Sequence, residues 1–268
     1  MVKTRYRGID MRPSALLDRS HKKILEGKYL ANRYVNYVLA AQKSSCLLYG
    51  LQRSGTNYLE HLIRSNFPGA RIRNANRRSH YRHKHWRLYA DNSLIPTRQY
   101  RSKLSAEDAK SFWTLLQNEG VHIDAVVVVV REPLHWYRSY QSWANRIKWP
   151  AVDHHYLQEW NAYYRTWRAL AAEDPERIAL IRYEDLLGSD ELAFSSLATV
   201  LRMPRVGTIK DFKHVPQSHD FDTTKRDANL SPLTLDDFPP DDRDAVLANL
   251  DPSLSQALGY TANSNIDT

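Results

Sequence analysis

The chain has 268 residues, a formal net charge of +8 from 38 Lys and Arg against 30 Asp and Glu, and a single Cys. Its length suits one α/β domain or at most two small ones, and a composition that is 42% hydrophobic excludes a disordered or fibrous chain. One Cys excludes an internal disulfide scaffold, and no apolar run reaches the roughly 18 residues that a transmembrane helix needs. The charged N-terminus also lacks the apolar core of a secretory signal, so we expect a cytoplasmic protein without a transmembrane segment.

The positive charge is unevenly distributed along the chain. Residues 1–43 contain ten Lys and Arg but only three Asp and Glu, whereas residues 227–268 contain one Arg and eight Asp. We interpret 1–43 as a basic N-terminal segment packed on a domain formed by 44–268. The excess of positive charge favours a substrate or partner rich in phosphate or sulfate, and a solvated basic surface is the alternative.

Hydrophobic periodicity predicts alternating strands and helices. Ala125–Val130 is a β-branched run typical of a strand buried on both faces of a parallel sheet, and Ser105 with Asp108 has the spacing of a capping box. Strands separated by helices predict a three-layer α/β/α fold with a central parallel sheet, in which ligands bind at the carboxyl ends of the strands. In chain order we expect a strand at 45–49, helices at 57–66 and 105–118, a strand at 124–130, helices at 133–146 and 154–172, a strand at 177–183, a helix at 191–201, and short helices and turns from 232 to 259.

The first predicted strand ends in a loop bounded by two glycines. Gly50 and Gly55 are separated by four residues and are followed by a predicted helix, which is the order of elements in an anion-binding loop. An ATP-binding P-loop has Lys and then Ser or Thr directly after its second glycine, but here Thr56 and Asn57 occupy those positions. The basic residue lies inside the loop instead, at Arg53. An ordinary glycine turn is the alternative interpretation.

The second predicted strand ends at Arg131, and Ser139 follows about two helical turns into the next helix. A nucleotide-hydrolysing enzyme would need a carboxylate for Mg²⁺ near this point. Arg and Ser at one strand end instead suit a bidentate grip on a phosphate monoester. An Arg that merely pairs with a surface carboxylate is the alternative.

These residues resemble the sulfotransferases that use 3′-phosphoadenosine 5′-phosphosulfate (PAPS). Three motifs carry the resemblance, which covers roughly residues 44 to 260 and extends to a closing Leu258-Gly259-Tyr260. In that family a Lys/Arg-Ser-Gly-Thr loop binds the 5′-phosphosulfate, an Arg-x-Pro segment with a Ser six residues after the Pro binds the 3′-phosphate, and a Tyr-Glu-Asp-Leu motif places its Tyr near the adenine. The matching segments here are Arg53-Ser54-Gly55-Thr56, Arg131 with Pro133 and Ser139, and Tyr183-Glu184-Asp185-Leu186.

The resemblance implies a set of nucleotide-binding residues and no metal. The donor substrate would be PAPS and the product adenosine 3′,5′-bisphosphate (PAP). A transferring sulfuryl group carries less negative charge than a phosphoryl group, so cationic side chains and backbone donors can stabilise it without Mg²⁺. Arg at position 53, where the cytosolic small-molecule branch usually has Lys, is common in the carbohydrate-modifying branch. The residues expected to bind the nucleotide are Arg53, Ser54, Gly55, Thr56, Asn57, Tyr58, Arg131, Ser139, Tyr183 and, from a poorly matching C-terminal segment, Arg226.

A general base is expected in the segment between the two phosphate motifs. Lys84-His85 is similar to the Lys-x-His element of the family, although its cytosolic Thr-His-Leu-Pro context is absent. We expect His85 to be the base, with a near-neutral pKa, and Lys84 and Arg53 to stabilise charge on the sulfate and the leaving phosphate. His83 is the rival base. The alternatives are a solvated basic loop or a zinc site that includes His80, and since Cys46 lies on a buried strand we expect no metal.

The acceptor is less well defined by the sequence. Several aromatic residues follow the predicted strand ends, and they would either stack on a sugar or pack helices against the sheet. Arg53 and the positive charge favour a carbohydrate or other polar acceptor, anionic ones included, over a flat apolar one. The other functions that we considered are a P-loop kinase or NTPase and a basic nucleic-acid-binding protein that would use 71–87; we expect no nucleic-acid partner. The aromatic residues are Trp86, Trp136, Tyr137, Trp143 and Trp149.

Overall fold

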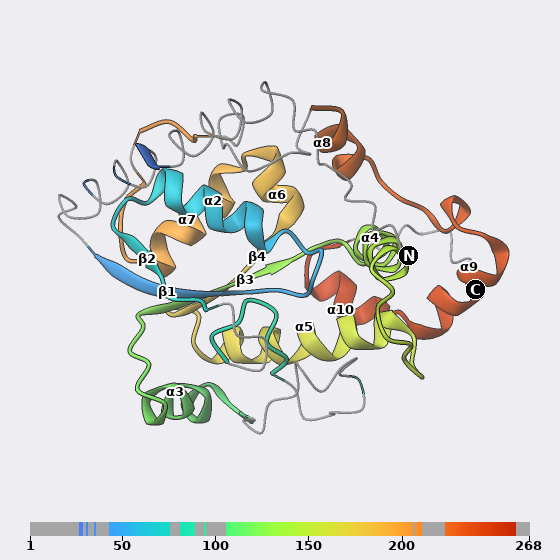
Figure 1. Ribbon diagram of the computed structural model, residues 1–268, viewed down its shortest axis with the longest axis horizontal. Coiled ribbons are helices and arrows are strands. Elements are labelled where there is room, and N and C mark those ends of the chain that lie inside the picture. Colours follow the sequence, from blue (N-terminus) through green and yellow to red (C-terminus); the bar gives the residue numbers. More distant parts are fainter. Residues whose placement is uncertain are drawn as a thin grey trace, which may run out of the picture.

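A sheet of four parallel strands forms the centre of the molecule. Figure 1 shows the computed structural model, which describes residues 43–75, 81–88, 106–205, 207–210 and 223–260 together with the single positions 27, 28, 31, 35 and 94. The spatial order of the strands is β2-β1-β3-β4, and all neighbouring pairs are parallel. The strands are β1 (Ser44–Tyr49), β2 (Ala70–Ile72), β3 (Ala125–Val130) and β4 (Ile178–Arg182).

Helices connect and cover these strands. Those predicted from periodicity begin and end within a few residues of the predicted positions. The helical elements are α2 (Thr56–Asn66), α3 (Ala109–Asn118), α4 (Pro133–Arg146), α5 (Tyr156–Glu173), α6 (Tyr183–Gly188), α7 (Glu191–Val200), α8 (Thr223–Leu230), the 3₁₀ helix η3 (Leu235–Asp237), α9 (Pro240–Asn249) and α10 (Pro252–Ala257).

The predicted capping box of α3 is wrong in its first residue. Asp108 itself is the N-cap, because its carboxylate accepts a hydrogen bond from the backbone N–H of Ser111 over 2.6 Å and Ser111 Oγ accepts one from Asp108 N–H over 3.1 Å. Ser105 lies outside the described residues. The edge strand β2 and the short helices α6 and α8 were not predicted, since each has too few residues for a clear hydrophobic period.

Helices cover both faces of the sheet, which confirms the predicted three-layer α/β/α fold. In Figure 1, α2, α6 and α7 lie on one side of the strands and α3 and α5 on the other. Leu47 of β1 belongs to the buried cluster that includes Phe112 of α3, whereas its neighbour Leu48 belongs to the cluster that includes Leu59 of α2. Successive strand residues face opposite sides, so one run of apolar residues contributes to both cores. Cys46 is completely buried in the second core, and burial raises the pKa of its thiol to about 12.

The parallel arrangement brings the three sequence motifs to one edge of the sheet. β1 is followed by the loop at Gly50, β3 by Arg131, and β4 by Tyr183. Because β1 pairs with β3 and β3 with β4, these three strand ends are neighbours. Of residues 1–43 only five are described, so the predicted N-terminal segment lies outside what the structure describes. Among the described helices, none combines the length and apolar character needed to cross a membrane.

Candidate functional site

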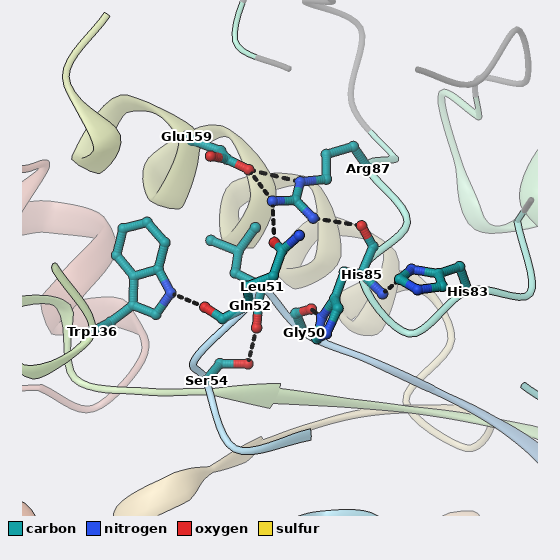
Figure 2. Close-up of polar contacts among 9 residues, drawn as sticks. All are labelled: Gly50, Leu51, Gln52, Ser54, His83, His85, Arg87, Trp136 and Glu159. Atoms are coloured by element: carbon teal, nitrogen blue, oxygen red, sulfur yellow. Dashed lines mark hydrogen bonds and ion pairs between the residues drawn. The ribbon is translucent and has the colours of Figure 1, made fainter. Parts of the chain in front are cut away.

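The loop after β1, residues 50–55, is called here the glycine loop. Its carbonyl groups are held by side chains (Figure 2). The ring nitrogen Nδ1 of His85 donates to the carbonyl oxygen of Gly50 over 2.8 Å, and Ser54 Oγ donates to the carbonyl oxygen of Leu51 over 2.7 Å. Both contacts involve residues that the sequence predicted to belong to the site.

Residues that follow strand β3 donate hydrogen bonds to the next two carbonyls of the glycine loop. Trp136 Nε1, on α4, donates to the carbonyl oxygen of Gln52 over 2.8 Å (Figure 2), and Arg131 Nη1 donates to that of Arg53 over 3.0 Å. All peptide bonds in the described chain are trans, so the N–H that follows each held carbonyl points to the opposite side of the backbone. Ser54 N–H is used within the loop, since it donates to the carbonyl oxygen of Leu51 over 3.1 Å, so an anion would have to bind the other N–H groups of the loop.

Helix α2 begins directly after the glycine loop. Its N-cap, Gly55, has no side-chain capping bond, so the N–H groups of the first turn have no partner from a cap side chain. The partial positive charge of a helix N-terminus attracts anions. The predicted residues Thr56, Asn57 and Tyr58 form this first turn, in which Thr56 and Tyr58 are buried and Asn57 is exposed.

Both glycines of the loop are required by its geometry. A Cβ on Gly50 would lie 2.5 Å from Ser54 Oγ. Gly55 has a φ of 96°, in the left-handed region, and a Cβ there would lie 2.3 Å from Cδ2 of Tyr183. The ring of Tyr183 thus packs directly on the glycine loop, which joins the third motif to the first.

Arg131 contacts both the Tyr183 ring and the glycine loop. It is only 8% exposed, its guanidinium is 5.3 Å from the centre of the Tyr183 ring, and Nη2 donates to Oδ1 of Asn229 on α8. Burial lowers its pKa, since the charged form loses hydration. In the part of the chain that the structure describes, Arg131 Nε is buried without a hydrogen-bond partner. A buried cation with an unused donor is suited to bind an anionic ligand.

Ser139 of α4 contacts the glycine loop through Arg53. Arg53 Nε donates to Ser139 Oγ over 3.2 Å, and Arg53 is exposed, with a positive φ of 72°. The structure therefore brings together the predicted residues Arg53, Arg131, Ser139 and Tyr183.

Lys84 lies beside the N-terminus of α2. Its Nζ donates to Asn57 Oδ1 over 3.0 Å and forms an ion pair with Glu60, which the sequence interpretation missed. The backbone carbonyl of Lys84 accepts a hydrogen bond from Gly50 N–H over 3.1 Å. Lys84 thus contacts Gly50 at the start of the glycine loop and Asn57 in the first turn of α2, and part of its charge is balanced by Glu60.

The contacts of His85 and His83 determine which nitrogens carry protons. A carbonyl oxygen accepts only, so Nδ1 of His85 holds the proton donated to Gly50 and Nε2 has the lone pair in the neutral ring. The backbone N–H of His85 donates to His83 Nδ1 over 3.2 Å, which leaves the proton of neutral His83 on Nε2. The predicted near-neutral pKa of His85 is wrong for this structure: burial lowers it to about 3, despite the hydrogen bond to Gly50. An anion bound nearby would raise this pKa again.

Two carboxyl groups lie between the second and third motifs. Glu132 caps α4 by accepting from His135 N–H over 2.7 Å, and its own N–H donates to Glu184 Oε1 over 3.0 Å. The other oxygen of Glu184 accepts from the hydroxyl of Tyr260, also over 3.0 Å. Burial, with a smaller contribution from the nearby Glu184, raises the pKa of Glu132 to about 7. Glu184, which follows β4, is thereby hydrogen-bonded both to Glu132 after β3 and to Tyr260 of the C-terminal Leu258-Gly259-Tyr260.

Most of the aromatic residues proposed for the acceptor are packing residues. Trp86 and Trp136 are 0% exposed, and Tyr137 is also buried, so these three rings present no face for a sugar. Trp143 and Trp149 are partly buried and lie against each other, with ring centres 5.0 Å apart.

Arg87 is also not part of a solvated basic loop, which was one interpretation of 71–87. It is 1% exposed and forms a buried ion pair with Glu159 of α5. The sequence interpretation assigned Glu159 no role, because its place in an amphipathic helix gives no sign of a polar partner.

Two predicted residues cannot be placed in the site. The side chain of Arg226, which belongs to α8 three residues before Asn229, lies outside the described residues, as does His80. Asn229 is a contact of Arg131 that the sequence interpretation missed. Within the described ranges no group of three His, Cys, Asp or Glu side chains is arranged to hold a metal ion.

Comparison of the chain with protein-family models, with curated proteins and with solved structures gave no match.

Proposed function

We propose that the protein is a sulfotransferase that moves the sulfuryl group of PAPS to an acceptor hydroxyl and releases PAP. The observation that carries the proposal is the glycine loop: four successive carbonyls, from Gly50 to Arg53, are held by hydrogen bonds, and two of the donors are Arg131 and His85. A loop built this way directs N–H groups to an anion. Arg131 and Ser139, the proposed ligands of a second phosphate, contact Arg53 of the same loop.

The two anionic ends of the nucleotide would bind at the two strand ends. The glycine loop and the first turn of α2, with Ser54, Thr56, Asn57 and Tyr58, would hold the 5′-phosphosulfate. Arg131 and Ser139 would hold the 3′-phosphate, because Arg131 has an unused buried donor and Ser139 a half-buried hydroxyl at the same edge. Tyr183 would lie near the adenine, and Arg226 would provide a further cation from α8.

The transfer step requires a nucleophile, a base and charge stabilisation. The acceptor oxygen forms a bond to sulfur while the bond from sulfur to the 5′-phosphate oxygen breaks, and the acceptor proton passes to Nε2 of His85. The charge that develops on the leaving phosphate is stabilised by Arg53 and by Lys84. Binding of the anionic donor would raise the low pKa of His85 and so make the imidazole a stronger base. The proposal needs no metal.

The acceptor class and location form part of the same proposal. Arg53 and the excess of positive charge support a carbohydrate or other polar acceptor, and the single Cys supports a cytoplasmic location. Screening candidate acceptors with labelled PAPS would identify the substrate.

Thermal unfolding with added PAP tests the nucleotide site without an acceptor. We expect PAP to raise the midpoint in the absence of Mg²⁺, and Arg131→Ala or Ser139→Ala to abolish the shift. Arg138→Ala is the matched control, since Arg138 is an exposed cation adjacent to Ser139 on α4. Stabilisation only by Mg·ATP would indicate a kinase or NTPase instead, and stabilisation only by an oligonucleotide would indicate a nucleic-acid-binding protein.

A further inference from the structure

A fully buried ion pair lies next to Gln52 of the glycine loop (Figure 2). Arg87 Nε donates to Glu159 Oε1 over 2.7 Å, and Nη2 is 2.5 Å from the same oxygen. Neither side chain is exposed, and Glu159 belongs to α5, whereas Arg87 follows the segment that carries Lys84 and His85. Charged side chains are rarely placed so deeply unless each is paired.

Arg87 contacts two further elements. Its Nη2 also donates to Oε1 of Gln52, in the glycine loop, and its Nη1 donates to the backbone carbonyl of His85 over 2.5 Å. The rigid fork of the guanidinium fixes the directions of these bonds relative to one another. One side chain therefore links helix α5, the glycine loop and the segment of His85.

Gln52 connects this pair to the second motif. Its side chain is 5% exposed and binds Arg87, while its backbone carbonyl is held by Trp136 of α4. Helix α4 also carries Ser139. A displacement of Arg87 would thus be transmitted to the loop and to its junction with α4.

Stability alone does not account for this arrangement. Replacing a buried ion pair by apolar side chains of similar volume is often neutral or stabilising, because the charges lose their hydration. Here Glu159 Oε2 and Gln52 Nε2 are buried and have no hydrogen-bond partner among the described residues, which adds to that cost. The surrounding cluster is apolar and includes Trp86 and Trp160.

We propose that Glu159 is a positioning residue, which acts through Arg87 to hold the glycine loop and His85 in one relative arrangement. The inference rests on the proposed function for the meaning of that arrangement, namely the alignment of a bound phosphosulfate with the base. Misplacement of about 1 Å at a reacting centre lowers rates by about 100-fold, so a rigid link of this kind has a catalytic consequence.

A double replacement separates positioning from stability. In Arg87→Met with Glu159→Leu, we expect a thermal midpoint at least as high as that of Glu159→Gln, in which the charge of Arg87 stays buried without a carboxylate to balance it. We nevertheless expect PAP to bind about tenfold more weakly, since the charge-assisted bond to Gln52 is lost. Amide hydrogen exchange in 50–58 should also become faster. Arg165→Met is the matched control, because Arg165 lies on α5 and its pair with Asp251 is exposed.

A second variant covers the case in which the double replacement does not fold. Gln52→Met leaves the ion pair intact and removes only its contact with the loop, and we expect the same weaker binding and faster exchange. Wild-type PAP affinity and loop exchange in either variant would overturn the inference. If the unchanged protein does not bind PAP, the proposed function fails, but the exchange of 50–58 still decides whether Glu159 positions the loop.

Discussion

Arg53 donates a hydrogen bond from Nε to Oγ of Ser139 over 3.2 Å, although the two residues are 86 positions apart in the chain. The contact joins the glycine loop after β1 to helix α4, which follows β3. Both side chains were expected from the sequence to bind different phosphates of one nucleotide. Their contact in the folded chain means that the two proposed phosphate positions are adjacent.

Replacing Arg53 should affect transfer more than nucleotide binding. Arg53 is exposed, whereas Arg131 is buried and is the proposed ligand of the 3′-phosphate, so we expect Arg53→Ala to retain most of the PAP affinity. The loss of one donor aimed at developing charge lowers turnover by about 100- to 1,000-fold in other enzymes. Turnover of labelled PAPS and calorimetric binding of PAP measure the two effects. Equal losses in both, or an equal effect of Arg138→Ala, would contradict the proposed role.

Glycine at position 55 should be more sensitive to replacement than glycine at position 120. Both have a positive φ, so alanine at either site costs about 1–2 kcal/mol of stability. A Cβ on Gly120 meets nothing within 4 Å, whereas one on Gly55 overlaps the Tyr183 ring. We expect Gly55→Ala to unfold at lower denaturant than Gly120→Ala and to lose the PAP shift, which Gly120→Ala keeps. Similar stability for the two variants would show that Tyr183 does not pack as described.

His85 holds the carbonyl of Gly50 and is also the proposed base, and one substitution separates these roles. In His85→Asn the amide nitrogen can replace Nδ1 as donor to Gly50, but the lone pair of Nε2 is lost. We expect the PAP thermal shift to persist while turnover falls about 100- to 10,000-fold. His83→Asn is the comparison variant. A fall in turnover only for His83→Asn would make His83 the base.

The imidazole of His85 should respond to ligand. Burial holds the pKa of this ring at about 3, so it is neutral in the ligand-free protein at ordinary pH. The phosphate that we propose to bind at the glycine loop would favour the protonated form and raise that pKa. An NMR titration with and without PAP measures the change. No rise with bound PAP would place the anion away from His85.

Glu132 should make the protein less stable as the pH rises from acid to neutral. Its pKa is about 7 in the folded protein against an ordinary value of 4.5, so between these values the unfolded chain releases a proton that the folded chain retains. The loss is roughly 3 kcal/mol at most over that interval. Denaturant unfolding at about pH 5 and about pH 8 should show a smaller decrease for Glu132→Gln, whose amide oxygen can still cap α4. The same decrease in both proteins would exclude Glu132 as its source.

Local patterns determined the predicted strands and helices and the order of the motifs. The run Ala125–Val130 would form a buried strand in almost any α/β protein, because β-branched residues favour extended backbone and an entirely apolar run must be buried. The two glycines, with a strand before them and a helix after them, predicted an anion-binding loop with an ordinary glycine turn as the alternative. The structure adds that a Cβ on Gly50 or Gly55 would overlap neighbouring side chains. Parallel pairing then brings the strand ends together.

The partners of the polar side chains were decided only by the tertiary structure. Arg87 belongs to a basic stretch in the sequence, but it is buried against Glu159, 72 residues away. The burial that lowers the pKa of His85 and the contact of Arg131 with Asn229 also arise only when distant parts of the chain pack together. Hydrophobic periodicity and glycine spacing determine backbone conformation within a few residues, so local structure can be predicted from the sequence. Charge pairing and desolvation depend on which distant groups share a water-free space, and that is determined when the helices pack on the sheet.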